Sequence, residues 1–207
     1  MLAGMAILTL IALPRLGGTP LREDQAICAN NLQLLAMGIH GWALDHGEDF
    51  PWKIYQKYGG SRGLPFTHQH WMVLSNYLPS VKALVCPATP RHPARSFATL
   101  NERNTSYLVG SDSEMAQPAT LLSADLDILG GTEGTCWFVG TAVVQRFAFI
   151  FGVPDTGRAR WSTTNHVGRG NVLSADGSVR QTDSAGLRSI LSVSTDNGND
   201  SHSLIPR

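Results

Sequence analysis

Residues 163–180 read T-T-N-H-V-G-R-G-N-V-L-S-A-D-G-S-V-R, and they decide the fold that we expect. The pair Asp176-Gly177 stands between two short runs of alternating polarity, residues 171–175 and 178–181. A tight hairpin turn needs positive φ angles, which these two residue types tolerate at the least cost. The stretch therefore predicts an antiparallel β-hairpin with Asp176-Gly177 at its turn.

Upstream of the hairpin, short apolar runs alternate with Gly, Pro, Ser and Asn, a pattern typical of strands and loops. We expect a short helix near residues 71–78. The expected further strands are residues 106–109, 120–124, 136–139, 143–151 and 161–165. Residues 195–203 are polar enough to predict a disordered tail.

The segment before residue 50 follows a helical period instead. Apolar residues recur at spacings of four, three, four and three, at Cys28, Leu32, Leu35, Ile39 and Trp42. Such a stripe predicts an amphipathic helix that packs on an apolar surface. Thr19 and Pro20 suit its first turn after a bend near residues 16–20, and Gly47 and Pro51 suit its end. One helix against an antiparallel sheet is an α+β fold.

Composition narrows the function classes. The chain has 207 residues, enough for one globular domain with an appended element. Lys+Arg and Asp+Glu both number 16, so no net charge would attract nucleic acid, and we predict no nucleic-acid partner. Charged residues make up 15% and glycines number 21, which favours a β-rich head with many turns.

Three cysteines, Cys28, Cys86 and Cys136, exclude a scaffold built on several disulfides. One bridge is compatible with an oxidising compartment. Small buried thiols are the expectation that we favour.

Nine residues separate His166 from Asp176-Gly177, and five further segments accompany this spacing in order. They are C-A-N-N-L-Q-L-L-A-M-G-I-H at 28–40, D-H-G-E-D-F-P at 45–51, V-C-P-A-T-P at 85–90, T-S-Y-L-V-G at 105–110 and P-A-T-L-L-S-A-D at 118–125. Together they resemble the type IV pilin-like proteins, or pseudopilins, in the prepilin-type processing-associated subgroup with a His-x9-Asp-Gly element. The residues that carry the resemblance are Cys28, Asn30, Asn31, Leu32, Pro51, Cys86, Pro87, Tyr107, His166, Asn171, Asp176 and Gly177.

The resemblance implies a pilin-like fold, in which an apolar N-terminal helix anchors the precursor in the bacterial inner membrane and later packs in a filament core. Residues 1–13 carry no charge, but a helix of that length rises about 20 Å, short of the roughly 30 Å hydrocarbon layer. The run could be a signal-peptide core, a buried helix or the C-terminal part of a longer membrane segment, and the resemblance favours the third. The assembly residues of this segment would be Leu2, Ile7, Leu8, Leu10, Ile11, Leu13 and Pro14. We therefore expect the C-terminal part of a membrane or filament helix over 1–18, a globular domain over 19–190 and a flexible tail over 191–207.

The family's Gly-Phe-Thr-Leu-x-Glu cleavage and methylation site does not precede this run. A start codon placed too far downstream, a fragment and a loss of processing are the three explanations, in that order. The expectation is an N-terminally truncated pseudopilin.

A catalytic dyad and a metal site are the two alternatives to a structural role for His166 and the acidic residues near it. A catalytic dyad of His166 and Asp176 is disfavoured, because an extended hairpin would separate them by about 13 Å. Asp176 is expected to form the turn, and His166 to be satisfied by backbone groups. Convergence of Asp125, Asp127 and Asp176 with His166 would create an oxygen-rich site suited to Ca²⁺. No other cofactor and no small-molecule substrate are predicted.

A second histidine pair, His68 and His70, could place two imidazoles on one face of a strand. No third zinc ligand is evident nearby, and we expect both histidines to be exposed.

The resemblance implies a structural subunit without catalysis, single-pass in the inner membrane, with its head in the periplasm or an extracellular filament. Its partners would be other pilin-like subunits and the assembly machinery of a type II secretion system or type IV pilus. The alternatives are a secreted or surface-anchored binding module on the same fold, and a metal-dependent hydrolase.

Overall fold

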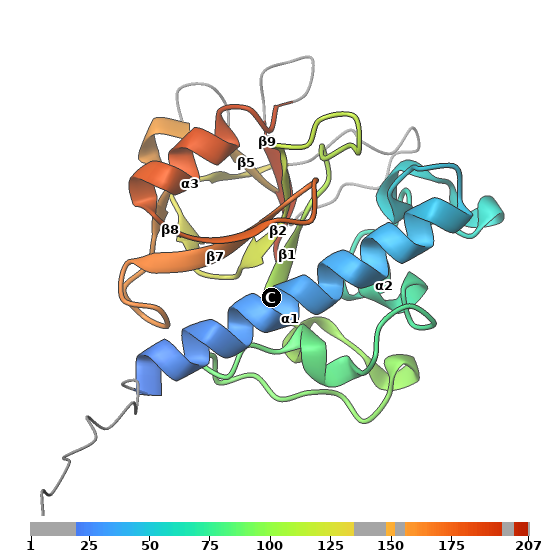
Figure 1. Cartoon of the computed structure of the whole chain (residues 1–207), viewed down its shortest axis with the longest axis horizontal. Helices are drawn as coiled ribbons and strands as arrows, with labels where there is room; N and C mark the ends of the chain where they lie inside the picture. The colour runs from blue at the N-terminus through green and yellow to red at the C-terminus, as the bar shows by residue number, and fades with distance from the viewer. Residues whose placement is uncertain (1–19, 135–147, 152–155, 196–200, 207) are drawn as a thin grey trace, which may run out of the picture.

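The computed structural model describes residues 20–134, 148–151, 156–195 and 201–206, and shows one long helix against an antiparallel sheet (Figure 1). The helices are α1 (Pro20–Asp45), α2 (Thr67–Val73) and α3 (Ser184–Leu191). The strands are β1 (Tyr107–Gly110), β2 (Leu121–Asp125), β3 (Ile128–Leu129), β4 (Thr132–Gly134), β5 (Ala148–Phe151), β6 (Arg160–Trp161), β7 (Arg169–Ser174), β8 (Val179–Asp183) and β9 (Ser201–Leu204). Short 3-10 turns are η1 (Pro51–Lys53), η2 (Gln56–Tyr58), η3 (Val81–Leu84), η4 (Phe97–Thr99), η5 (Glu102–Asn104) and η6 (Thr156–Arg158).

The main sheet has seven strands in the order β4-β5-β9-β1-β2-β7-β8, and every neighbouring pair is antiparallel. β3 and β6 form a separate antiparallel pair. The expected α+β class, with an N-terminal helix on an antiparallel sheet, is therefore confirmed.

The hairpin that decides the fold forms as expected between β7 and β8. Leu173 pairs with Val179, and the turn between them holds Gly177 at a φ of +81°. The backbone N–H of Ser178 donates to Oδ1 of Asp176 at 2.9 Å, so the aspartate closes the turn with its side chain. Asp176 is a turn former, as its position in the sequence predicts.

α1 carries the predicted apolar stripe. All five stripe residues, from Cys28 to Trp42, are buried, at most 2% exposed. Gly47 adopts a φ of +77° just after the helix ends. Among the described residues, α1 begins at Pro20. Residues 1–19, which include the anchor segment and nearly all of the predicted bend, lie outside the described part of the chain.

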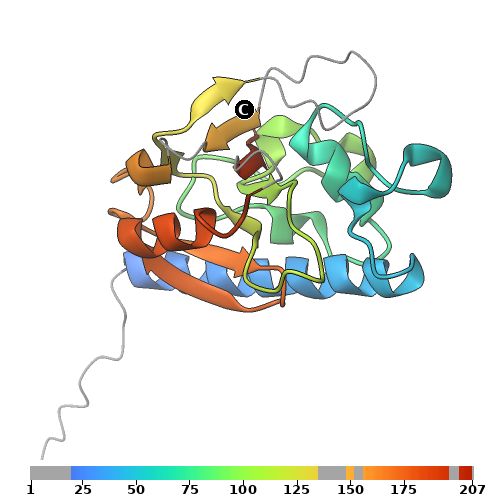
Figure 2. The same cartoon turned by 90° about the horizontal axis from the view of Figure 1, so that it is seen from above.

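Two apolar cores lie on opposite faces of the sheet, because successive strand residues point to opposite sides. Val109, Leu122 and Leu173 face α1, whereas Leu108 and Val172 face α3. Figure 1 shows α1 crossing the view with the strands on one side and the segment containing α2 on the other. Seen from above in Figure 2, most of the chain lies to one side of α1.

Two local predictions need correction. The short helix is α2, which begins at Thr67 rather than at residue 71. At its start, the side chain of Gln69 accepts from the backbone N–H of Phe66 at 3.1 Å. The strand expected over 161–165 stops at Trp161, because the next backbone groups turn to Asp127: Ser162 N donates to its carbonyl and Asn165 N to its Oδ2. The strand expected over 136–139 and residues 143–147 lie outside the described residues.

The flexible tail expected over 191–207 is wrong for its last part. Residues 201–204 form β9, which lies inside the sheet between β1 and β5. Ser201 and Ser203 are buried there despite their polarity. Their backbone groups are paired with β1 and β5, so hydropathy alone could not reveal this strand.

Candidate functional site

A disulfide between Cys28 and Cys86 joins the N-terminal part of α1 to the segment after η3. Both sulfurs are buried, and the bridge closes a loop with a sequence separation of 58 residues. The expectation of buried free thiols is therefore wrong for this pair. Cys136, the third cysteine, lies outside the described residues.

His166 packs its ring against this disulfide. Its Nε2 atom lies 3.3 Å from Sγ of Cys86 and 3.3 Å from Oδ2 of Asp125. A disulfide sulfur carries no hydrogen, so Nε2–H is the donor in this contact. The ring is thus bound by side chains, and the expectation that backbone groups satisfy it is wrong. The backbone contact belongs to its carbonyl, which accepts from the side-chain amide of Gln25 at 3.2 Å.

Asp125 ends β2 and is held by Asn171 of β7. The backbone N–H and the side-chain amide of Asn171 donate to Oδ2 of Asp125 at 2.7 and 3.0 Å. The same amide donates to the carbonyl of Gln25 in α1 at 3.2 Å. Asn171 therefore orients the carboxylate and ties the sheet to the helix.

Burial governs the protonation of this site. Desolvation raises the pKa of Asp125 to about 7, although the hydrogen bonds from Asn171 work in the opposite direction. Desolvation lowers the pKa of His166, opposed by the charges of Asp127 and Asp24. The pKa of Asp127 is raised by its burial as well. Burial therefore shifts both the acid and the base of this site toward their neutral forms.

A second buried polar contact lies one turn along α1. The side-chain amide of Asn31 donates to the carbonyl of Val85 at 2.9 Å and to the phenol oxygen of Tyr107 at 3.1 Å. Burial raises the pKa of Tyr107, so the phenol stays protonated. This contact joins α1, the segment next to Cys86 and β1.

The remaining residues that carry the resemblance have simpler positions. Leu32 belongs to the core under α1, and Pro51 is buried in η1. Asn30 and Pro87 are exposed. Within the described residues, the structure brings together Cys28, Cys86, His166 and Asn171 at one point, and Asn31 with Tyr107 beside it.

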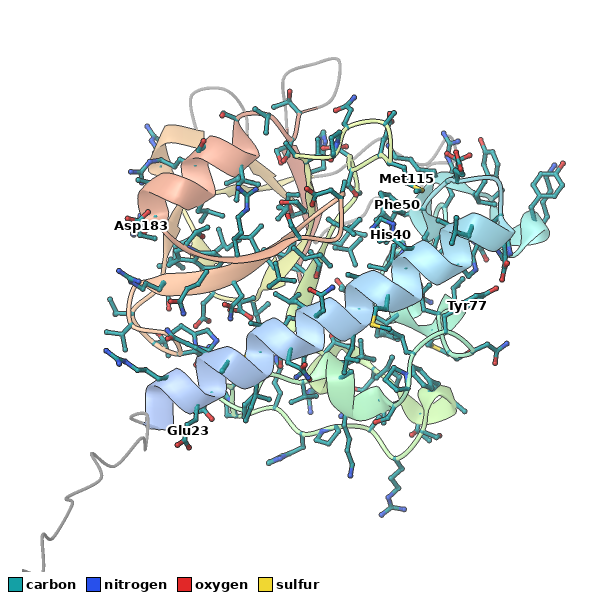
Figure 3. The ribbon with its side chains drawn as sticks, in the orientation of Figure 1. Glu23, His40, Phe50, Tyr77, Met115 and Asp183 are labelled. Atoms are coloured by element: carbon teal, nitrogen blue, oxygen red, sulfur yellow. A yellow bond between two sulfur atoms is a disulfide. The ribbon has the colours of Figure 1, made fainter. Side chains whose placement is uncertain are left out.

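The Asp176-Gly177 turn meets α1 at a different point. A Cβ atom placed on Gly177 would lie 3.6 Å from Nε2 of His40. Figure 3 labels His40 and Phe50, whose rings meet edge-on at a centroid distance of 5.7 Å. Cys28 and His40 are about 18 Å apart along a helix that rises 1.5 Å per residue. The His166 end and the turn end of the hairpin therefore contact α1 at two separated points.

The oxygen-rich calcium set is not assembled. Asp125 lies at the disulfide, Asp127 accepts from the backbone of Asn165, and Asp176 closes the turn. In the described part of the chain, the group with metal-ligand geometry consists of Cys28, Cys86, Asp125 and His166. The sequence contained each member, but a spacing of 58 residues between the cysteines gave no local signal for their convergence.

The histidine pair also differs from expectation. His68 and His70 lie on α2 rather than on a strand, and His70 is buried. Its Nδ1 pairs with Oγ of Ser61 at 2.8 Å and its Nε2 with the carbonyl of Leu64 at 3.2 Å. His68 contacts Oε1 of Glu102 at 2.7 Å instead. The two rings therefore have separate partners.

Comparison with known proteins identifies no relative of this chain. No protein-family model, curated protein or solved structure matches the chain. Within the described ranges, no helix combines the length and the apolar character that crossing a membrane requires.

Proposed function

We propose that the chain is a pilin-like (pseudopilin) structural subunit of a type II secretion or type IV pilus-like assembly. In this proposal its N-terminal apolar segment sits in the inner membrane or in a filament core, and the α+β head faces the periplasm or the exterior. Its function in this proposal is to assemble with other pilin-like subunits. The sequence resemblance motivates the assignment, and one structural observation supports it.

That observation is the covalent and buried polar attachment of α1 to the head. The 26-residue helix is joined to the sheet side by the Cys28–Cys86 disulfide and by the hydrogen bonds of Asn31 and Asn171. A subunit pulled or packed through its helix must transmit that load to its head. The uncharged run at residues 1–13 lies six residues before this helix in the sequence.

The site itself suits a structural role. Its four central side chains are at most 2% exposed, so they line no open surface on which a substrate could bind. We infer that the cluster holds the fold together and performs no catalysis.

The test places charge in the apolar run. Leu10→Glu should release the chain from membranes on carbonate extraction and remove it from sheared filaments, because an ionised side chain is costly in a bilayer or a helix bundle. The matched control is Met37→Glu, which adds the same charge at an α1 position that is 66% exposed. The control should fold, partition and assemble like the parent.

Each arm should be run on the chain from Met1 and on one extended to any upstream in-frame start. If neither parent resists extraction, or if Leu10→Glu assembles as well as Met37→Glu, the subunit proposal is wrong. A head that folds, is exported and never enters filaments would instead support a secreted binding module.

A further inference from the structure

Four metal-ligand atoms meet under α1 in a group that we call the sulfur-carboxylate cluster. It consists of the Sγ atoms of Cys28 and Cys86, a carboxylate oxygen of Asp125 and a ring nitrogen of His166. These atoms all lie within 4.8 Å of one another, and every member is buried. Ligands at about 2.0–2.3 Å from a tetrahedral Zn²⁺ are about 3.3–3.8 Å apart. Nε2 of His166 lies at this spacing from Sγ of Cys86 and from Oδ2 of Asp125, at 3.3 Å from each, and, apart from the two bonded sulfurs, the remaining pairs need to close by about 1 Å at most.

We propose that the sulfur-carboxylate cluster, when its disulfide is reduced, binds one Zn²⁺, so that the metal and the disulfide are alternative states of one site. Two thiolates with an imidazole favour zinc over calcium, because soft sulfur ligands select soft or borderline metals. The single carboxylate completes four-coordination.

Two buried atoms support this assignment. Nδ1 of His166 and Oδ1 of Asp125 have no hydrogen-bond partner among the described residues. An orphaned buried polar atom costs about 1–3 kcal/mol, so such atoms call for an unseen partner such as an ion or water. Oδ1 of Asp125 keeps its lone pairs free for a cation, and Nε2 of His166 already faces the cluster, 3.3 Å from Sγ of Cys86.

A supporting shell for the ligands is also present. Asn171 donates two hydrogen bonds to Oδ2 of Asp125, which holds that carboxylate in place while its other oxygen stays free. Gln25 of α1 holds the backbone of His166 through its carbonyl. Such second-shell contacts preorganise metal ligands.

The two states interconvert by a balanced reaction. Zn²⁺ binding to the dithiol displaces one proton from each thiol. Oxidation by a small-molecule disulfide removes two electrons from the two thiolates, forms the Cys28–Cys86 bond and releases Zn²⁺, while the oxidant takes up two protons and leaves as two thiols. A newly made chain starts in the dithiol state, so zinc can occupy the site before the bridge forms.

The experiment uses the full chain carrying Cys136→Ser, which leaves the two cluster cysteines as its only thiols. After reduction with a water-soluble phosphine and removal of oxygen, the protein is titrated with Co²⁺ and then with Zn²⁺. We expect one Co²⁺ per chain, with thiolate-to-cobalt charge transfer and the visible bands of a tetrahedral ion, displaced by Zn²⁺. The oxidised protein should bind neither ion.

The variants Asp125→Asn and His166→Ala should each weaken Zn²⁺ binding by at least about 100-fold, beyond the range seen for second-shell changes. Asn at 125 can still accept from Asn171, which preserves the local structure. The matched control is Asp127→Asn, a neighbouring carboxylate outside the cluster, whose Zn²⁺ affinity should equal that of the parent.

Circular dichroism in each state separates binding from folding. If the reduced chain is unfolded, refolding by one equivalent of Zn²⁺ is the expected result. The proposal is overturned if reduced protein takes up no Co²⁺ and is not refolded by Zn²⁺. It is equally overturned if Asp125→Asn binds as tightly as Asp127→Asn.

Discussion

The side-chain amide of Asn31 lies between two acceptors, the phenol oxygen of Tyr107 at 3.1 Å and the carbonyl of Val85 at 2.9 Å. All three residues are buried, so no water can replace a lost partner cheaply. This one side chain joins α1, β1 and the segment that carries Cys86.

Asn31→Ala should therefore lower the free energy of unfolding by about 2 kcal/mol, the cost of leaving buried polar groups unpaired. Urea unfolding at neutral pH measures the change. Asn30→Ala is the matched control at an exposed position and should shift stability by no more than about 0.5 kcal/mol. Equal effects of the two substitutions would contradict this account.

Loss of the Cys28–Cys86 bridge should destabilise the head by about 4 kcal/mol, from the loop-closure entropy of a bridge with a sequence separation of 58. The comparison is between oxidised and phosphine-reduced protein in a chelating buffer, again by urea unfolding. The double variant Cys28→Ala with Cys86→Ala should have the stability of the reduced parent, and the reductant should not change it. A reduced parent as stable as the oxidised one would show that the bridge contributes nothing.

Stability should also fall in mild acid because of His70. Burial lowers the pKa of its imidazole from 6.5 to about 4, so the unfolded chain takes up a proton that the folded chain refuses. This contribution is fully present above pH 6.5 and is lost as the pH falls from 6.5 to about 4, by up to about 3 kcal/mol. Urea midpoints across this range should drop more steeply for the parent than for His70→Gln. His92→Gln, at an exposed position, is the control and should keep the parent profile.

Gly177→Ala should cost about 1 kcal/mol, because the residue holds a φ of +81° that disfavours any L side chain. Sterics are not the cause, since the added Cβ would meet His40 at an ordinary 3.6 Å. Gly157→Ala, where nothing lies within 4 Å and φ is not positive, is the control for the loss of a glycine. Thermal or urea unfolding measures the loss of stability in each variant. An equal loss in both would show that the positive φ of Gly177 is not the cause.

The sequence predicted those parts of the fold that local rules control. The stripe from Cys28 to Trp42 determined which face of α1 is buried, because helical periodicity is a property of neighbouring residues. The pair Asp176-Gly177 likewise determined a turn and, through it, the β7–β8 pairing. The strands β1 and β2 also lie within one residue of the expected positions.

Tertiary structure decided what depends on distant residues. β9 is a strand because β1 and β5 flank it, although its own Ser-His-Ser-Leu sequence is mostly polar. The sulfur-carboxylate cluster exists because α1, the segment after η3, the end of β2 and the loop before β7 meet at one point. The separation of 58 residues between the two cysteines carries no information about that meeting, since packing of the apolar faces, rather than any local spacing, brings the four side chains together.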